Sequence, residues 1–115
     1  MHKIYYLSSC DTCKRIMKET GTEGFEIIDI KQQHISAEDL AIAAEQLGGY
    51  LALFNMRAQK IKAMGIDPKS ASEAELKQWI LDEYTFLKRP VYFIENEVFA
   101  GNSKSTTEDI KAAIH

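Results

Sequence analysis

The spacing of hydrophobic positions along the chain predicts a mixture of strands and helices. Short apolar runs at Ile4-Tyr5-Tyr6-Leu7, Phe25–Ile30 and Val91–Ile94 are typical of buried strands. A tight turn at Asn96 leads into Val98–Ala100, which indicates a β-hairpin. Between and after these runs, apolar residues recur three and four positions apart, as they do on one face of a helix.

Capping residues predict where the helices begin and end. Ser72 and Glu75 form a capping box, which opens a helix with Leu76, Trp79 and Ile80 on one face. Further helices are expected after the first strand with Cys13, Ile16, Met17 and Thr20 on one face, from Ser36 to Gly48-Gly49, over Met56–Met64, and from Ser105 with packing through Ile110, Ala113 and Ile114.

The order of these elements predicts an α/β fold with a mixed four-stranded sheet. A strand–helix–strand half comes first and a hairpin followed by a helix comes last. About fifty residues of helix, roughly 36–86, form an insertion between the two halves. With 115 residues, the chain is expected to form a single domain over residues 1–115.

Composition narrows the function classes. The chain is 45% hydrophobic and 27% charged, which is ordinary for a globular protein, and its net charge of −3 argues against a broad nucleic-acid surface. No apolar stretch reaches the ~20 residues that a membrane span needs. The strand-like run begins directly after Met1, so no signal peptide is expected and the cytoplasm is the predicted location.

The only two cysteines form the motif Cys10-Asp11-Thr12-Cys13 between the first strand and the first helix. A CxxC at this junction is typical of thioredoxin-like redox sites. Unpaired N–H groups and the dipole at a helix N-terminus favour an anion, so the Cys10 thiol is expected to ionise readily. A thiolate is a nucleophile, and a thiol three residues later can displace what the first one captures.

Three other interpretations of the pair remain open. A structural zinc site needs four ligands, and the three histidines have no useful spacing to the thiols. A structural disulfide across so short a loop would remove little unfolded-state entropy. Two unreactive thiols at a helix start would need no function at all.

Three segments together give the chain a resemblance to a known family. Cys10, Asn55-Met56-Arg57 and Lys88-Arg89-Pro90-Val91 occur in the order and spacing of the ArsC/Spx/YffB family. This family includes arsenate reductases coupled to glutaredoxin and the transcription regulator Spx. The resemblance covers nearly the whole chain and implies a thioredoxin-like three-layer fold.

The resemblance also implies a site. In the arsenate reductases the cysteine that matches Cys10 attacks arsenic, and Arg57 and Arg89 match two arginines that bind the oxyanion. A planar guanidinium suits this role because it binds two oxygens at once and stays charged. Pro90 matches a cis proline that faces the cysteine. Lys104 stands near the position of a third arginine, where it offers only a point charge.

The function implied is that of a thiol oxidoreductase of the arsenate reductase family. Cys10 would attack an oxyanion or a disulfide, and Cys13 would resolve the intermediate. Glutathione with glutaredoxin, or thioredoxin, would be the reductant, with no bound cofactor and no metal. Because Cys13 is also a feature of Spx, the alternative is a redox-sensing regulator that binds the α subunit of RNA polymerase.

Overall fold

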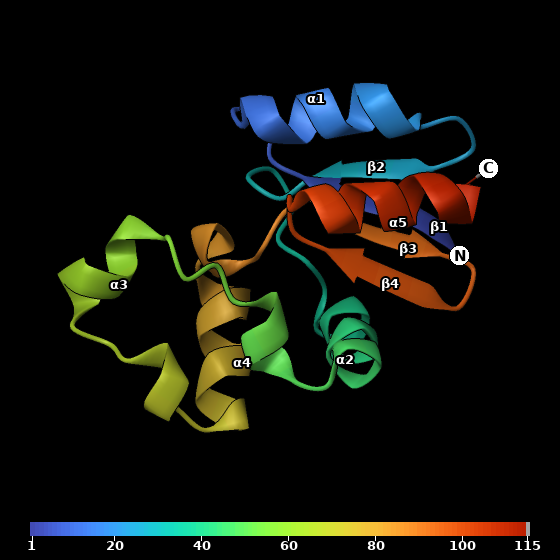
Figure 1. Ribbon diagram of the computed structural model, residues 1–115. Coiled ribbons are helices and arrows are strands. Elements are labelled where there is room, and N and C mark those ends of the chain that lie inside the picture. Colours follow the sequence, from blue (N-terminus) through green and yellow to red (C-terminus); the bar gives the residue numbers. More distant parts are fainter. Residues whose placement is uncertain (115) are drawn as a thin grey trace. The chain divides into compact units, whose positions relative to one another are not determined.

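The computed structural model describes residues 1–114, which fall into two compact units. The first unit consists of Met1–Gln33 together with the residues from Arg89 onward. The second is His34–Lys88. The elements of both units are labelled in Figure 1, and each unit is described by itself.

A four-stranded sheet forms the centre of the first unit (Figure 1). Its strands are β1 (His2–Tyr6), β2 (Glu26–Asp29), β3 (Val91–Ile94) and β4 (Glu97–Ala100), in the spatial order β2-β1-β3-β4. The β1–β2 pair is parallel, whereas β1–β3 and β3–β4 are antiparallel. The predicted α/β fold with a mixed four-stranded sheet is therefore confirmed.

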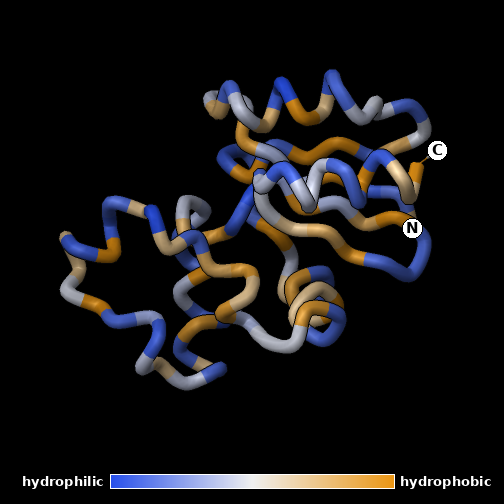
Figure 2. Tube along the Cα trace, viewed as in Figure 1, coloured by the Kyte–Doolittle hydropathy of each residue, from blue (hydrophilic) through white to orange (hydrophobic). Residues whose placement is uncertain are grey.

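Two helices, α1 (Asp11–Thr20) and α5 (Lys104–Ile114), lie side by side over this sheet (Figure 1). Ile110 of α5 is fully buried and joins Ile4 and Tyr92 in one hydrophobic cluster. The Tyr92 hydroxyl also lies 2.7 Å from the hydroxyl of Thr20 at the end of α1, so the polar tip of this buried ring has a partner. Figure 2 shows how hydrophobic residues follow the strands and alternate with hydrophilic ones along α1.

The second unit consists of helices, the segments that connect them, and one isolated β-bridge between Phe54 and Leu87. Its elements are α2 (Ala37–Leu47), η1 (Tyr50–Leu53), α3 (Gln59–Met64), η2 (Pro68–Ser70), α4 (Glu73–Asp82) and η3 (Tyr84–Phe86). Phe54 is fully buried and stacks on Phe86 with ring centroids 5.0 Å apart, while Trp79 packs edge-on against it at 6.4 Å. The predicted capping box of α4 is present, with Ser72 and Glu75 each bonded to the other's backbone N–H.

The predicted helix over Met56–Met64 is wrong at its start, because α3 begins only at Gln59. A turn occupies the preceding residues. The Asn55 side-chain oxygen accepts the Arg57 N–H at 3.1 Å, and the Asn55 backbone oxygen accepts the Ala58 N–H at 3.2 Å. An Asn side chain that bonds the backbone two residues later competes with helix formation.

The last helix also differs from the prediction. Ser103, not Ser105, caps α5, because its Oγ accepts the Thr106 N–H at 3.1 Å. The buried face also differs from the prediction, because Thr107 joins Ile110 in the interior whereas Ala113 is exposed. Ile114 is half-buried, as the predicted packing requires.

None of the helices within residues 1–114 combines the length and the hydrophobicity needed to cross a bilayer.

Candidate active site

Cys10 is the N-cap of α1, the last non-helical residue before the helix. Its backbone is extended, and its Sγ accepts the backbone N–H of Cys13 at a donor–acceptor distance of 3.4 Å. A turn places Cys10 at the start of the helix, because the Cys10 N–H donates to the Leu7 carbonyl at 2.9 Å. The side chain is half-buried. The sulfur thus takes the place that a Ser or Asp oxygen usually takes at a helix start.

The surroundings of Cys10 favour its thiolate. Burial alone would raise its pKa, but hydrogen bonds from the backbone and the side chain of Cys13 lower it. The charge and the side-chain hydrogen bond of Arg89 lower it further, so that the pKa lies below its usual value. A lowered pKa on a partly exposed thiol is the usual mark of a reactive cysteine.

Cys13 has the opposite properties. It is completely buried on the inner face of α1, and its thiol is free. Burial raises the pKa of Cys13 to about 12, with the negative charge of Cys10 acting in the same direction. Cys13 therefore stays protonated at neutral pH and can donate a hydrogen bond to the Cys10 sulfur.

Arg89 and Pro90 connect the second unit to strand β3 in the sequence, and both belong to the first unit. Arg89 is half-buried and Pro90 is buried. The peptide bond between them is cis, the conformation that the family resemblance led us to expect. The Pro90 carbonyl accepts the Gly101 N–H at 3.0 Å, which ties this segment to the end of β4.

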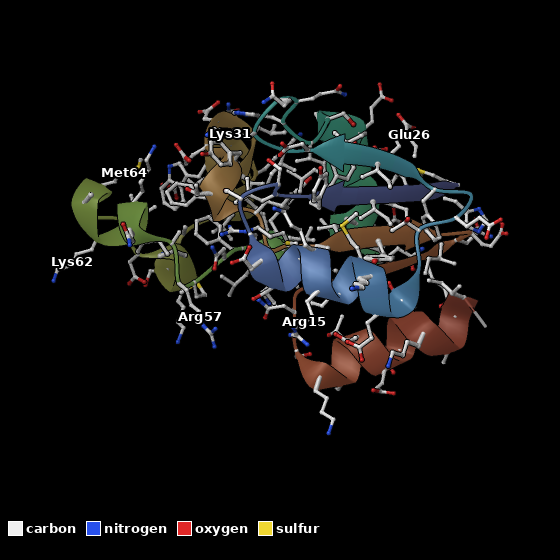
Figure 3. The ribbon with its side chains drawn as sticks, turned by 90° about the horizontal axis from the view of Figure 1, so that it is seen from above. Arg15, Glu26, Lys31, Arg57, Lys62 and Met64 are labelled. Atoms are coloured by element: carbon white, nitrogen blue, oxygen red, sulfur yellow. The ribbon has the colours of Figure 1, made fainter. Side chains whose placement is uncertain are left out.

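The other two residues predicted to bind an anion, Arg57 and Lys104, are more exposed than Arg89. Arg57 belongs to the second unit and is exposed on the turn before α3, where Figure 3 shows its side chain extending away from the helix. Lys104 is the first residue of α5 and is exposed. Among the predicted residues, the contacts of the first unit bring together Cys10, Cys13 and Arg89.

Asp29 lies near this site, and no sequence pattern had indicated a role for it. It ends β2, and its Oδ1 accepts the backbone N–H of Ser8, two residues before Cys10. The only sequence signal is an acid at the end of a strand that pairs with β1. That signal is common, and it acquires meaning only once the parallel pairing of the two strands is known.

Thiol chemistry is what this arrangement can perform. It offers an accessible sulfur with a lowered pKa, a second sulfur three residues away and a guanidinium beside the first. Within residues 1–114, no three side chains of metal-binding type gather in one place.

Solved structures with a similar fold include three that match nearly the full length of the chain. A protein named YFFB has a TM-score of 0.80 at 20% identity, covering 100% of each chain. An arsenate reductase from Vibrio cholerae has a TM-score of 0.79 at 17% identity, covering 95% of this chain and 96% of its own. An arsenate reductase (ArsC) related protein from Brucella melitensis has a TM-score of 0.69 at 19% identity, covering 94% and 92%.

At these identities the structures establish the thioredoxin-like fold, and the sequence itself carries the family assignment. A comparison with curated proteins finds no match. The model of the ArsC family, in contrast, matches residues 5–110, which extend from the end of β1 to the interior of α5. This protein belongs to the ArsC family.

Proposed function

We propose that this protein is a thiol oxidoreductase in which Cys10 is the nucleophile and Cys13 the resolving thiol. The observation that carries the proposal is the contrast between two sulfurs in one turn of helix. Cys10 is partly exposed with a lowered pKa, whereas Cys13 is sealed and protonated. Such a pair separates the sulfur that meets the substrate from the sulfur that acts only afterwards.

The substrate class that fits Cys10 is an arsenate-like oxyanion or a disulfide. With arsenate, the Cys10 thiolate forms a sulfur–arsenic(V) bond, and one arsenate hydroxyl takes up a proton from the solvent and leaves as water. With a disulfide, it forms a mixed disulfide and one thiol leaves. Arg89 supports either reaction because its charge favours the thiolate and can also bind an anionic oxygen. Arg57 and Lys104 are further oxyanion contacts implied by the family.

The attack of Cys13 on the modified Cys10 becomes easier because the charge at Cys10 changes. Once that sulfur is covalently bonded it no longer carries the negative charge that helps to raise the pKa of Cys13. The Cys13 thiol then loses its proton more easily and attacks the Cys10 sulfur. A Cys10–Cys13 disulfide forms, and two electrons pass to the substrate, releasing arsenite or the second thiol. A dithiol such as thioredoxin, or glutathione with glutaredoxin, restores both thiols.

Turnover by the two serine variants tests this mechanism. Cys10→Ser should abolish reduction of both arsenate and a small disulfide, since no other thiolate is exposed in residues 1–114. Cys13→Ser should accumulate a covalent adduct on Cys10 that mass spectrometry detects after acid quenching. Wild-type turnover by Cys10→Ser would eliminate the mechanism.

The reductant is identified in parallel. Thioredoxin with its reductase and glutathione with glutaredoxin are supplied separately to wild type and to Cys13→Ser. A resolving role for Cys13 predicts that only wild type turns over with thioredoxin, whereas glutathione can replace Cys13 in the variant. Equal turnover of both proteins with thioredoxin would contradict the role of Cys13.

A further inference from the structure

Parallel pairing brings the loop before Cys10 next to the end of β2. Tyr6, the last residue of β1, pairs with Asp29, the last residue of β2. The ladder continues one residue further, because the Ile30 N–H donates to the Tyr6 carbonyl at 2.8 Å. The two strands therefore end together, and the loops that follow them begin side by side.

The Asp29 carboxylate joins these two loops. Its Oδ1 accepts the backbone N–H of Ser8 at 3.3 Å and that of Lys31 at 3.1 Å. The Ser8 side chain also hydrogen-bonds to it. Figure 3 shows Lys31 just beyond β2, at the opposite end of the strand from Glu26. One half-buried carboxylate thus binds the backbone of both the loop after β1 and the loop after β2.

Ser8 is part of the turn that presents the nucleophile. The hydrogen bond from the Cys10 N–H to the Leu7 carbonyl makes residues 7–10 a turn, with Ser8 as its second residue. Fixing the Ser8 N–H fixes the plane of the Leu7–Ser8 peptide. That plane sets the direction in which the chain enters α1, and so the position of the Cys10 sulfur relative to the Cys13 N–H.

We propose that Asp29 is a positioning residue that holds the Cys10 loop in its reactive geometry. Asp29 acts through the backbone of Ser8 and touches no reacting atom. Its importance for turnover rests on the proposed function, but its effect on the Cys10 sulfur does not.

Geometry and charge predict opposite effects of Asp29, which makes the proposal testable. Burial alone would raise the pKa of Asp29, but the hydrogen bonds from Ser8 and Lys31 lower it, so the group is ionised at neutral pH. A negative charge disfavours a nearby thiolate. If Asp29 acted only as a charge, removing it would speed the reaction of Cys10, whereas the loss of positioning would slow it.

The experiment measures the rate of Cys10 alkylation by iodoacetamide against pH in protein with Cys13 intact. Asp29→Ala should slow alkylation at pH 7 by about fivefold, because the loss of one net hydrogen bond lowers the population of the reactive loop conformation by this factor. It should also raise the pKa of Cys10. Asp29→Asn keeps an acceptor oxygen for both N–H groups and should stay within about twofold of wild type.

Two further variants keep the test decisive. Ser8→Pro removes the N–H donor at a turn position that accepts proline, so it should reproduce the slower alkylation while leaving Asp29 in place. Glu26→Gln removes an equal charge from the same strand, where Glu26 lies 4.0 Å from Lys3, and should change nothing.

Wild-type rates in both Asp29→Ala and Ser8→Pro would overturn the proposal, as would equal acceleration by Asp29→Ala and Asp29→Asn. Because alkylation does not require turnover, the alkylation rates can be interpreted even if the protein shows no reductase activity. Slower alkylation with no reductase activity in wild type would reject the proposed function and keep the positioning role.

Discussion

Arg89 and Arg57 have contrasting settings, although the family resemblance assigns both to one anion site. Arg89 is half-buried beside Pro90 and acts on the Cys10 sulfur through charge and a hydrogen bond. Arg57 is exposed, and its backbone N–H is held by Asn55. The residues that lower the pKa of Cys10, which are Cys13 and Arg89, therefore both belong to the first unit.

A second comparison concerns one titratable group in the first unit and one ion pair in the second. In the first unit, burial leaves Cys13 protonated far above neutral pH. In the second unit, Lys60 and Glu83 form an ion pair. Burial would raise the pKa of Glu83, but its bonds with Lys60 and Thr85 lower it, and Glu83 in turn raises the pKa of Lys60. Burial thus keeps Cys13 neutral, whereas pairing keeps Glu83 and Lys60 charged.

The largest expected effect is a loss of stability when the hydrophobic core around Phe54, in the second unit, is disrupted. Phe54→Ala removes a fully buried ring between Phe86 and Trp79, and should lower the free energy of unfolding by about 3–5 kcal/mol. Urea unfolding measures this change. Ile42→Ala, at an exposed hydrophobic position of α2, is the matched control and should stay within about 0.5 kcal/mol. Equal effects of both variants would contradict the packing around Phe54.

The next effect is a pH dependence of the free energy of unfolding that arises from Cys13. Folding raises the pKa of Cys13 to about 12 from its usual value of 9.0, so the unfolded chain releases this proton first. The stabilisation is complete below pH 9 and is lost as the pH rises toward 12, by about 1.4 kcal/mol per pH unit at most. Urea unfolding of wild type and Cys13→Ala at pH 8 and pH 10.5 measures the difference. Identical pH dependence would show that Cys13 titrates normally.

Arg89 variants test the activation of Cys10 directly. Arg89→Ala should raise the pKa of Cys10 and slow its alkylation at pH 7 by roughly tenfold, because an opposite charge no longer favours the thiolate. Arg89→Lys keeps the charge without the planar hydrogen-bonding group and should fall between the two. An unchanged rate in Arg89→Ala would remove Arg89 from the thiol site.

The smallest effect is expected for Arg57. Arg57→Ala removes an exposed side chain, while its backbone bond to Asn55 remains. The free energy of unfolding should change by less than about 0.5 kcal/mol, and alkylation of Cys10 should not change. A loss of alkylation rate as large as that of Arg89→Ala would erase the contrast between the two arginines.

Local sequence signals predicted the parts of the fold that are themselves local. The Ser72 capping box, the hairpin turn at Asn96 and the cysteine pair at a helix start are each set by a few consecutive residues. The family resemblance added the cis peptide bond before Pro90, which no spacing of residues could indicate. Arg89 entered through the same resemblance.

What the sequence did not indicate depends on contacts between distant segments or between competing local bonds. Asp29 reaches Ser8 only because two strands pair in one register. The last helix was predicted to begin at Ser105, but the Ser103 hydroxyl caps it, and Thr107 rather than Ala113 is buried. The Asn55 turn shortened α3 because its amide also donates to the distant Thr85 carbonyl at 3.1 Å.

Under the mechanism that we propose, the sulfur of Cys10 has two roles that exclude each other. As a thiolate it accepts the Cys13 N–H and so completes the first turn of α1. Once it is bonded to arsenic or to another sulfur, it becomes a much weaker acceptor, and the helix loses its cap. Every catalytic cycle would thus fray and restore the beginning of α1, at a cost of about 1 kcal/mol each time. The covalent intermediate would carry its own loosened helix end, which amide hydrogen exchange at Thr12 and Cys13 would reveal.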